Sequence, residues 1–151
     1  MNKPINRVSM EDAESFARIN RAANALDEYQ QLATTSAIYP GQGTPFGLMY
    51  AALGLAEAGE VQNKVKKIFR DDGVIEFVSG GLDEGGYETY FKPVSEDRKQ
   101  QIAKELGGLL WYAAACCNEI GLKLSEVAAG NLLELASRAQ RGTLGGSGDD
   151  R

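Results

Sequence analysis

Apolar residues recur at helical spacing along most of this 151-residue chain. From Ser9 to Ala37 they fall mostly three or four residues apart, as one face of an α-helix requires. This pattern fits either one long helix or two shorter ones. A loop is predicted from Tyr39 to Pro45, where two prolines and two glycines interrupt the pattern. A second helix is predicted from about Phe46 to Arg70.

Two further helices are predicted in the second half of the chain. The third begins at Ser95, which two acidic residues follow as in many N-caps, and Gly121 is placed to end it. The fourth is predicted to have Ser125 as its cap and to reach about Gln140. A glycine-rich C-terminal tail follows from about residue 142.

The segment from Asp71 to Pro93 differs from the helical parts. Two runs rich in β-branched and aromatic residues, Val74–Val78 and Tyr87–Phe91, flank a glycine-rich stretch. A hairpin or flap and an irregular loop explain this composition equally well. We therefore expect one all-α domain over residues 1–151, a bundle of about four helices with a small flap or hairpin insertion around residues 71–93.

The composition narrows the range of functions. The formal net charge of -5 argues against non-specific binding to nucleic acid or to an acidic membrane. The chain has no histidine, which excludes Ser-His-Asp triads, histidine general bases and histidine-rich zinc sites. Adjacent Cys116 and Cys117 in a short apolar stretch predict reduced thiols in a cytoplasmic protein without a signal peptide. Hydrolytic chemistry would have to come from carboxylates, lysines, tyrosines or a hard metal ion.

Carboxylates at helical spacing form the candidate site. Glu57 and Glu60 stand three residues apart on one helix face, roughly 5–6 Å apart at Cβ, and this spacing can bracket a divalent cation. Lys64 and Lys67 continue the same side, although a glutamate four residues before a lysine is also common on ordinary exposed helices. Glu105 borders the apolar seam of the third helix, where a carboxylate needs water, a partner or a metal.

Several runs of residues resemble motifs of the MazG-like nucleotide pyrophosphohydrolases. Tyr50–Val61 followed by Asn63–Lys67 resembles their first acidic motif, and Lys104–Tyr112 resembles the second. The resemblance covers roughly Tyr29 to the end of the chain. The C-terminal part is similar to the tail of short phage and bacterial members at Asn131, Leu135, Arg138 and Gly146–Arg151.

The resemblance implies an all-α fold in which the acidic helices of a dimer or tetramer bind Mg²⁺ or Mn²⁺. It also implies an activity in which water splits a nucleoside triphosphate into a monophosphate and pyrophosphate. Separately from the resemblance, we expect the base to be guanine or another purine. The metal ligands, which are also the catalytic residues, would be Glu57, Glu60 and Glu105. The residues that bind phosphate or substrate would be Lys64, Lys67, Asn131 and Arg138.

The chain departs from the family pattern at two positions. The second motif normally reads ExxD, and Gly108 stands where the aspartate is expected. Either a neighbouring acid replaces it, or the metal binds more weakly, or catalysis is impaired. Glu134 stands where a basic residue is expected. The alternatives to the hydrolase are a nucleotide-binding regulatory module with weakened catalysis and a helical oligomerisation protein.

Overall fold

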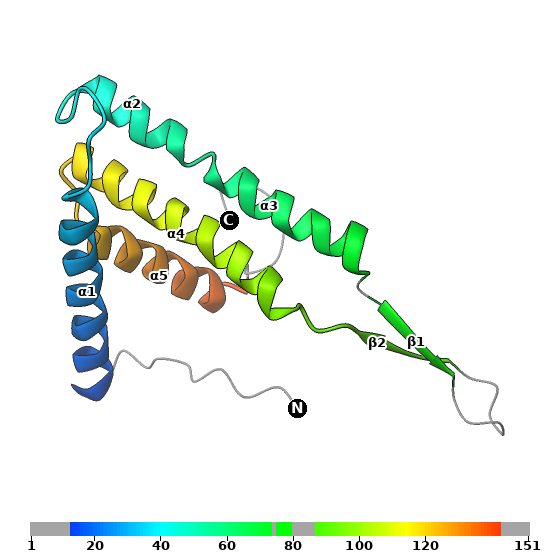
Figure 1. The fold of residues 1–151 in the computed structure, drawn as a ribbon. Helices are drawn as coiled ribbons and strands as arrows, with labels where there is room; N and C mark the ends of the chain where they lie inside the picture. The colour runs from blue at the N-terminus through cyan, green and yellow to red at the C-terminus, as the bar shows by residue number, and fades with distance from the viewer. Residues whose placement is uncertain (1–12, 74, 80–86, 143–151) are drawn as a thin grey trace. The chain divides into compact units, whose positions relative to one another are not determined.

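A computed structural model describes residues 13–73, 75–79 and 87–142 of the chain (Figure 1). The α-helices in these ranges are α1 (Ala13–Thr34), α2 (Pro45–Gly54), α3 (Glu57–Lys67), α4 (Glu96–Glu119) and α5 (Leu124–Gln140). A short π-helical segment, η1 (Ile68–Asp72), continues α3, and two strands follow, β1 (Ile75–Ser79) and β2 (Tyr87–Phe91). The described chain is thus predominantly helical, as the sequence predicted. No described helix has the length and apolar character needed to cross a membrane.

The chain divides into two compact units. The terminal unit contains residues 1–48 and 114–151, and the central unit contains residues 49–113. The helices α2 and α4 therefore each contribute residues to both units.

In the terminal unit, α1 packs against α5. Its core is small and consists of Ala114, Cys117 and Leu124, with Leu26 and Ala33 of α1 packed against them. The prediction left open whether the first segment is one helix or two, and α1 is a single helix of 22 residues.

The start of α5 is held by polar side chains of α1. The Gln30 side chain donates to the Leu122 carbonyl at 2.9 Å and accepts from the Leu124 N–H at 2.7 Å. The Asp27 carboxylate accepts from the Ser125 N–H at 3.3 Å. The prediction that Ser125 caps this helix is wrong, because α1 supplies the acceptors for the first free N–H groups and the helix already begins at Leu124.

The predicted loop before α2 is fixed to the end of α4. The Tyr39 hydroxyl donates to the Glu119 carboxylate at 2.6 Å, and the Gly43 N–H donates to the same carboxylate at 2.8 Å. Burial, followed by this hydrogen bond, raises the pKa of Tyr39 to about 12. As predicted, Gly121 follows the helix end, with a φ of 69° that favours glycine.

The predicted second helix, from Phe46 to Arg70, is interrupted. α2 ends at Gly54, and the Leu55 and Ala56 N–H groups bond three residues back instead of four. Gly54 lies against the Tyr112 ring so closely that an added Cβ would come within 2.0 Å of it. The apolar periodicity continues through this turn, which is why the sequence pattern did not reveal it.

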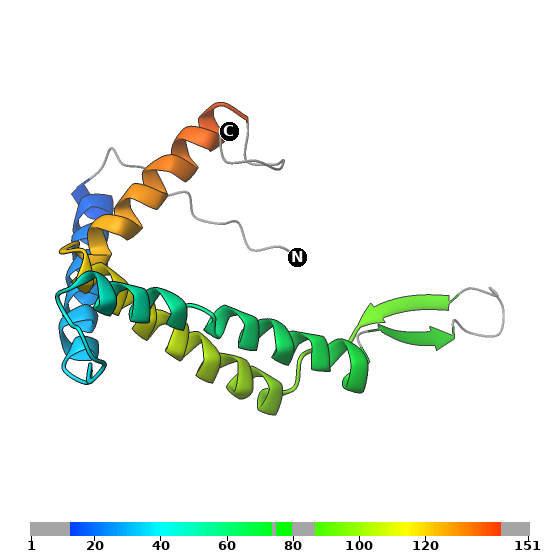
Figure 2. The ribbon, with the colours of Figure 1, turned by 90° about the horizontal axis from the view of Figure 1, so that it is seen from above.

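In the central unit, α3 and the first part of α4 lie side by side, as both views show (Figures 1 and 2). β1 and β2 form an antiparallel pair with Ile75 opposite Phe91 and Ser79 opposite Tyr87. This pairing lies within the segment for which a hairpin or an irregular loop was predicted, and residues 80–86 lie outside the described residues. The tail predicted from about residue 142 also lies outside them from residue 143 onward.

The packing of Gly54 on Tyr112 yields a prediction about stability. Gly54→Ala should lower the free energy of unfolding by about 1–3 kcal/mol, because a methyl group is forced into filled space. Gly59→Ala is the matched control: nothing lies within 4 Å of its added Cβ, and alanine should stabilise α3 by up to about 1 kcal/mol. Urea denaturation of both variants measures the difference. Equal stability of the two variants would contradict this packing.

Candidate functional site

Three contacts join α3 and the preceding turn to α4 in the central unit. Gly54 lies against Tyr112, Glu57 lies against Gly108, and Lys64 pairs with Glu105. The residue numbers rise along one partner and fall along the other, so the two segments run antiparallel. The two predicted acidic motifs are thereby brought together.

Glu57 is placed in the first turn of α3, where an acidic side chain is favoured by the helix dipole. It is half-buried. A Cβ added at Gly108 would lie 3.3 Å from the Glu57 carboxyl carbon and from one of its oxygens. The position at which the resemblance expects an aspartate therefore faces the first predicted metal ligand directly.

Glu105 forms an ion pair with Lys64. Lys64 Nζ lies 3.2 Å from Glu105 Oε1, and the two side chains are only 23% and 15% exposed. A carboxylate at this edge was expected to need water, a partner or a metal, and in this structure the partner is an ammonium group. Glu105 also precedes Gly108 by three residues on α4, so the two positions share one flank of the helix.

The remaining predicted residues of α3 are less enclosed. Glu60 is exposed, and Lys67 is partly buried in the last turn of the helix. Among the residues that the structure describes, no three acidic or thiol side chains are gathered tightly enough to form a ready metal site. The structure thus brings Glu57 to Gly108 and Lys64 to Glu105, and Glu60 is an exposed carboxylate one turn along α3 from Glu57.

Asn131 and Arg138 lie on α5 and belong to the terminal unit. Asn131 is exposed and Arg138 is partly buried. Their role as phosphate-binding residues stays a prediction. Glu134, the second departure from the family pattern, is exposed on the same helix.

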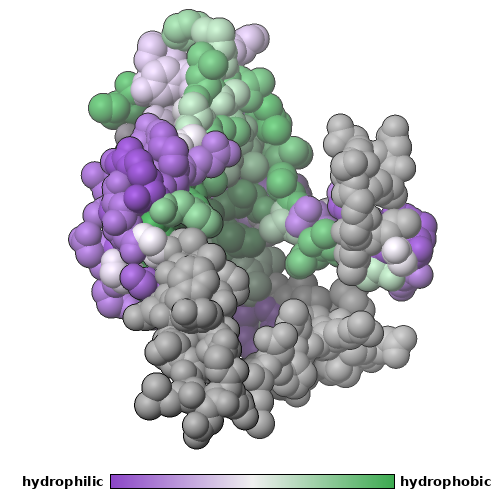
Figure 3. Space-filling view, turned by 90° about the vertical axis from the view of Figure 1, so that its right-hand side faces the viewer, coloured by the Kyte–Doolittle hydropathy of each residue, from purple (hydrophilic) through white to green (hydrophobic). Residues whose placement is uncertain are grey.

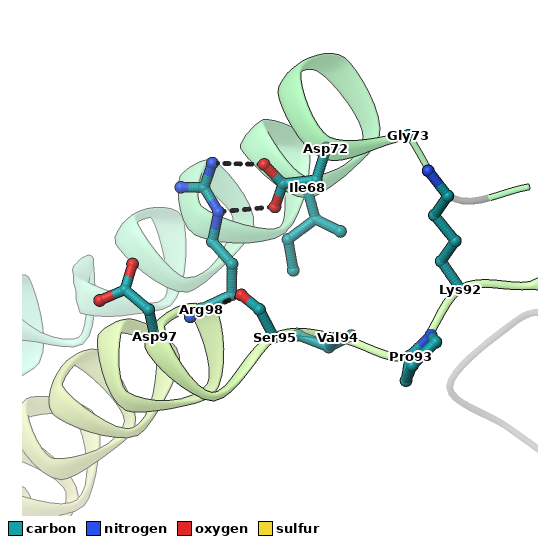
Figure 4. A pocket seen from close by; sticks show the side chains of 9 residues that line it. All are labelled: Ile68, Asp72, Gly73, Lys92, Pro93, Val94, Ser95, Asp97 and Arg98. Carbon is teal, nitrogen blue, oxygen red and sulfur yellow. Dashed lines mark hydrogen bonds and ion pairs between the residues drawn. The ribbon is translucent and has the colours of Figure 1, made fainter.

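A hollow at the base of the strand pair was not predicted from the sequence (Figure 4). It has a volume of about 420 Å³, and its lining includes Ile68, Lys92, Val94 and the paired side chains of Asp72 and Arg98. Arg98 donates to the two Asp72 oxygens at 2.8 and 2.9 Å, and this bonding lowers the pKa of the Asp72 carboxyl. The adjacent Asp71 and Asp72, with Arg98 at the start of the next helix, are the signal in the sequence that could have indicated this ion pair.

Comparison with known proteins places the chain in a family. It is 40% identical over 131 residues to the Gene 37 protein of Mycobacterium phage L5, and the match covers 83% of this chain and 98% of the phage protein. The chain belongs to the family of this phage protein. No family model matches the chain, and no solved structure matches it.

The match with the Gene 37 protein spans nearly the whole length of that relative. The family is therefore shared over a whole protein and is not limited to one motif. The name of the relative states no activity, so the function has to be argued from the side chains on α3 and α4.

Proposed function

We propose that the chain hydrolyses a nucleoside triphosphate to a monophosphate and pyrophosphate with Mg²⁺ or Mn²⁺ as its cofactor. The observation that supports this most strongly is the pair of contacts where α3 packs on α4, Glu57 against Gly108 and Lys64 with Glu105. Acidic and basic side chains lie there partly shielded from solvent. An acidic pair suits a cation, and a lysine beside it suits the phosphates that such a cation accompanies.

The available ligands fit a hard divalent cation. Glu57 and Glu105 offer carboxylate oxygens, which Mg²⁺ and Mn²⁺ prefer to nitrogen or sulfur. Glu105 already pairs with the Lys64 ammonium group at 3.2 Å, and a carboxylate that pairs with one cation can also bind another. A divalent ion bound there would neutralise phosphate charge and lower the pKa of water, which removes the need for a histidine base.

Each side chain has a separate binding role in the proposed reaction. Glu57 and Glu105 hold the cation from two helices, with Glu60 as a further oxygen donor one turn along α3. Lys64 and Lys67 bind phosphate oxygens from the same helix. The expected base is guanine or another purine.

A nucleotide-binding regulatory module is the second candidate. Gly108 favours it, because the position facing Glu57 carries no carboxylate. A site with fewer acidic ligands holds its metal more weakly and neutralises less of the charge that develops during hydrolysis. Tight nucleotide binding without release of pyrophosphate would identify this candidate.

We also propose that the chain associates with itself, as a dimer or a tetramer. No large side chain is fully buried among the described residues, and Leu53, Phe69 and Leu110 of the central unit are 69%, 63% and 52% exposed. Figure 3 shows apolar residues, coloured green, at the surface in the upper part of the view. A second copy of the chain would remove such side chains from water.

Self-association predicts the mass in solution. Light scattering should give at least twice the chain mass of 16.2 kDa, because a single copy leaves these apolar side chains exposed. Leu53→Ser should shift the measured mass toward that of one chain. A stable, fully active monomer of the parent protein would contradict the proposal.

The proposed reaction is tested by pyrophosphate release from the eight common nucleoside triphosphates with Mg²⁺ or Mn²⁺. At least one should be hydrolysed, and Glu57→Gln should reduce its turnover at least about 100-fold, a loss of about 2.7 kcal/mol in transition-state stabilisation. Glutamine keeps the helix propensity of α3. Glu96→Gln removes a carboxylate that is 80% exposed in the same unit, and its turnover should match that of the parent.

If Glu57→Gln releases pyrophosphate at the parental rate, the assignment of the site is wrong. If no nucleotide is hydrolysed but one raises the melting temperature, the regulatory module replaces the hydrolase, since a ligand of the native state stabilises it. If no nucleotide is hydrolysed or bound, both candidates are wrong.

A further inference from the structure

Lys64 and Glu105 form an ion pair, but the proposed function gives them different ligands. Glu105 is assigned to the metal, and Lys64 is assigned to phosphate. In the structure they are bonded to each other at 3.2 Å, with 23% and 15% of their side chains exposed. Each is therefore held by the other in this structure.

The charged groups around this ion pair affect how a metal ion could bind to it. Glu57 contributes a second carboxylate against Gly108, and Gly108 contributes none where the resemblance expects an aspartate. Lys64 therefore offsets the charge of Glu105, and position 108 adds no further carboxylate beside Glu57. The lysine is covalently part of α3, so its local concentration at Glu105 is high and does not depend on the metal concentration.

A divalent ion and the ammonium group would compete for the same carboxylate. A metal ion bound to Glu105 would lie a few ångströms from Lys64 Nζ, and like charges at that distance repel strongly where the side chains are largely shielded from water. Lys64 would therefore have to leave Glu105 before the metal binds. A triphosphate is an anion that can receive the released ammonium group.

We propose that Lys64 is an internal counter-ion of Glu105, which a divalent metal ion displaces and a triphosphate captures. This inference rests on the proposed function and adds a mode of regulation to it. Metal and triphosphate then each favour binding of the other, because each separates the same ion pair, and linkage makes this effect reciprocal. The protein alone holds metal weakly, and the loaded site assembles when both ligands are present.

The first test measures Mn²⁺ binding in the absence of nucleotide. Binding is monitored through the electron paramagnetic resonance signal of the free Mn²⁺ ion. Lys64→Met should bind Mn²⁺ at least about tenfold more tightly than the parent, a gain of about 1.4 kcal/mol. Lys66→Met is the matched control, because it removes the same charge from an exposed position of the same helix. Its affinity should stay within about twofold of the parental value by the same measure.

A double variant tests whether the effect passes through Glu105. In the Glu105→Gln background, adding Lys64→Met should give no gain in Mn²⁺ affinity, because the competition has been removed. The second test uses tripolyphosphate in the presence of a chelator. Glu105→Gln should bind it more tightly than the parent, because Lys64 is released, and Lys64→Met should bind it more weakly.

The outcomes separate the two proposals. If the parent binds Mn²⁺ and hydrolyses a nucleotide, but Lys64→Met and Lys66→Met bind Mn²⁺ equally, the counter-ion proposal is overturned and the proposed function stands. If neither the parent nor any variant binds Mn²⁺ or tripolyphosphate, both are overturned. Lys64→Gln replaces Lys64→Met if the latter does not fold, as judged by circular dichroism.

Discussion

The packing of α3 on α4 is the interaction on which the chemistry of the central unit depends. It is made possible at one end by Gly54, whose missing side chain admits the ring of Tyr112. Farther along, the same approach brings Glu57 to Gly108 and Lys64 to Glu105. A separation large enough for a side chain at Gly54 would also loosen these two contacts, because all three belong to the same pair of antiparallel segments. Packing and the placement of charge are therefore coupled.

The helices of the central unit also carry exposed apolar side chains. The helices that carry the charged side chains also leave large apolar side chains such as Leu53 and Leu110 exposed. The terminal unit is stabilised differently. It has a small apolar core, and polar side chains of α1 bind the start of α5. Self-association and the charged site are thus proposed for the same helices of the central unit, and a change in one is expected to affect the other.

The sequence predicted the helical character of the chain and the residues that meet at α3 and α4. Hydrophobic periodicity located the helices, but it did not reveal the break after Gly54, because the apolar spacing continues through the turn. It also could not show that Gln30 and Asp27 supply the acceptors at the start of α5, since these contacts join residues more than ninety positions apart. The partner of Glu105 was also not predicted, because Lys64 lies 41 positions earlier in the chain and on another helix. Only the structure could show that Lys64 reaches it.

The central claim is that Glu57, Glu105 and position 108 border one cation site. The most direct test is Mn²⁺ binding by Gly108→Asp, which restores the expected carboxylate beside Glu57. Gly107→Asp is its control, because that glycine is exposed and nothing lies within 4 Å of its added Cβ. The account predicts that Gly108→Asp binds Mn²⁺ about tenfold more tightly than the parent, a difference of about 1.4 kcal/mol, and that Gly107→Asp does not. Equal affinities of the two variants would contradict it.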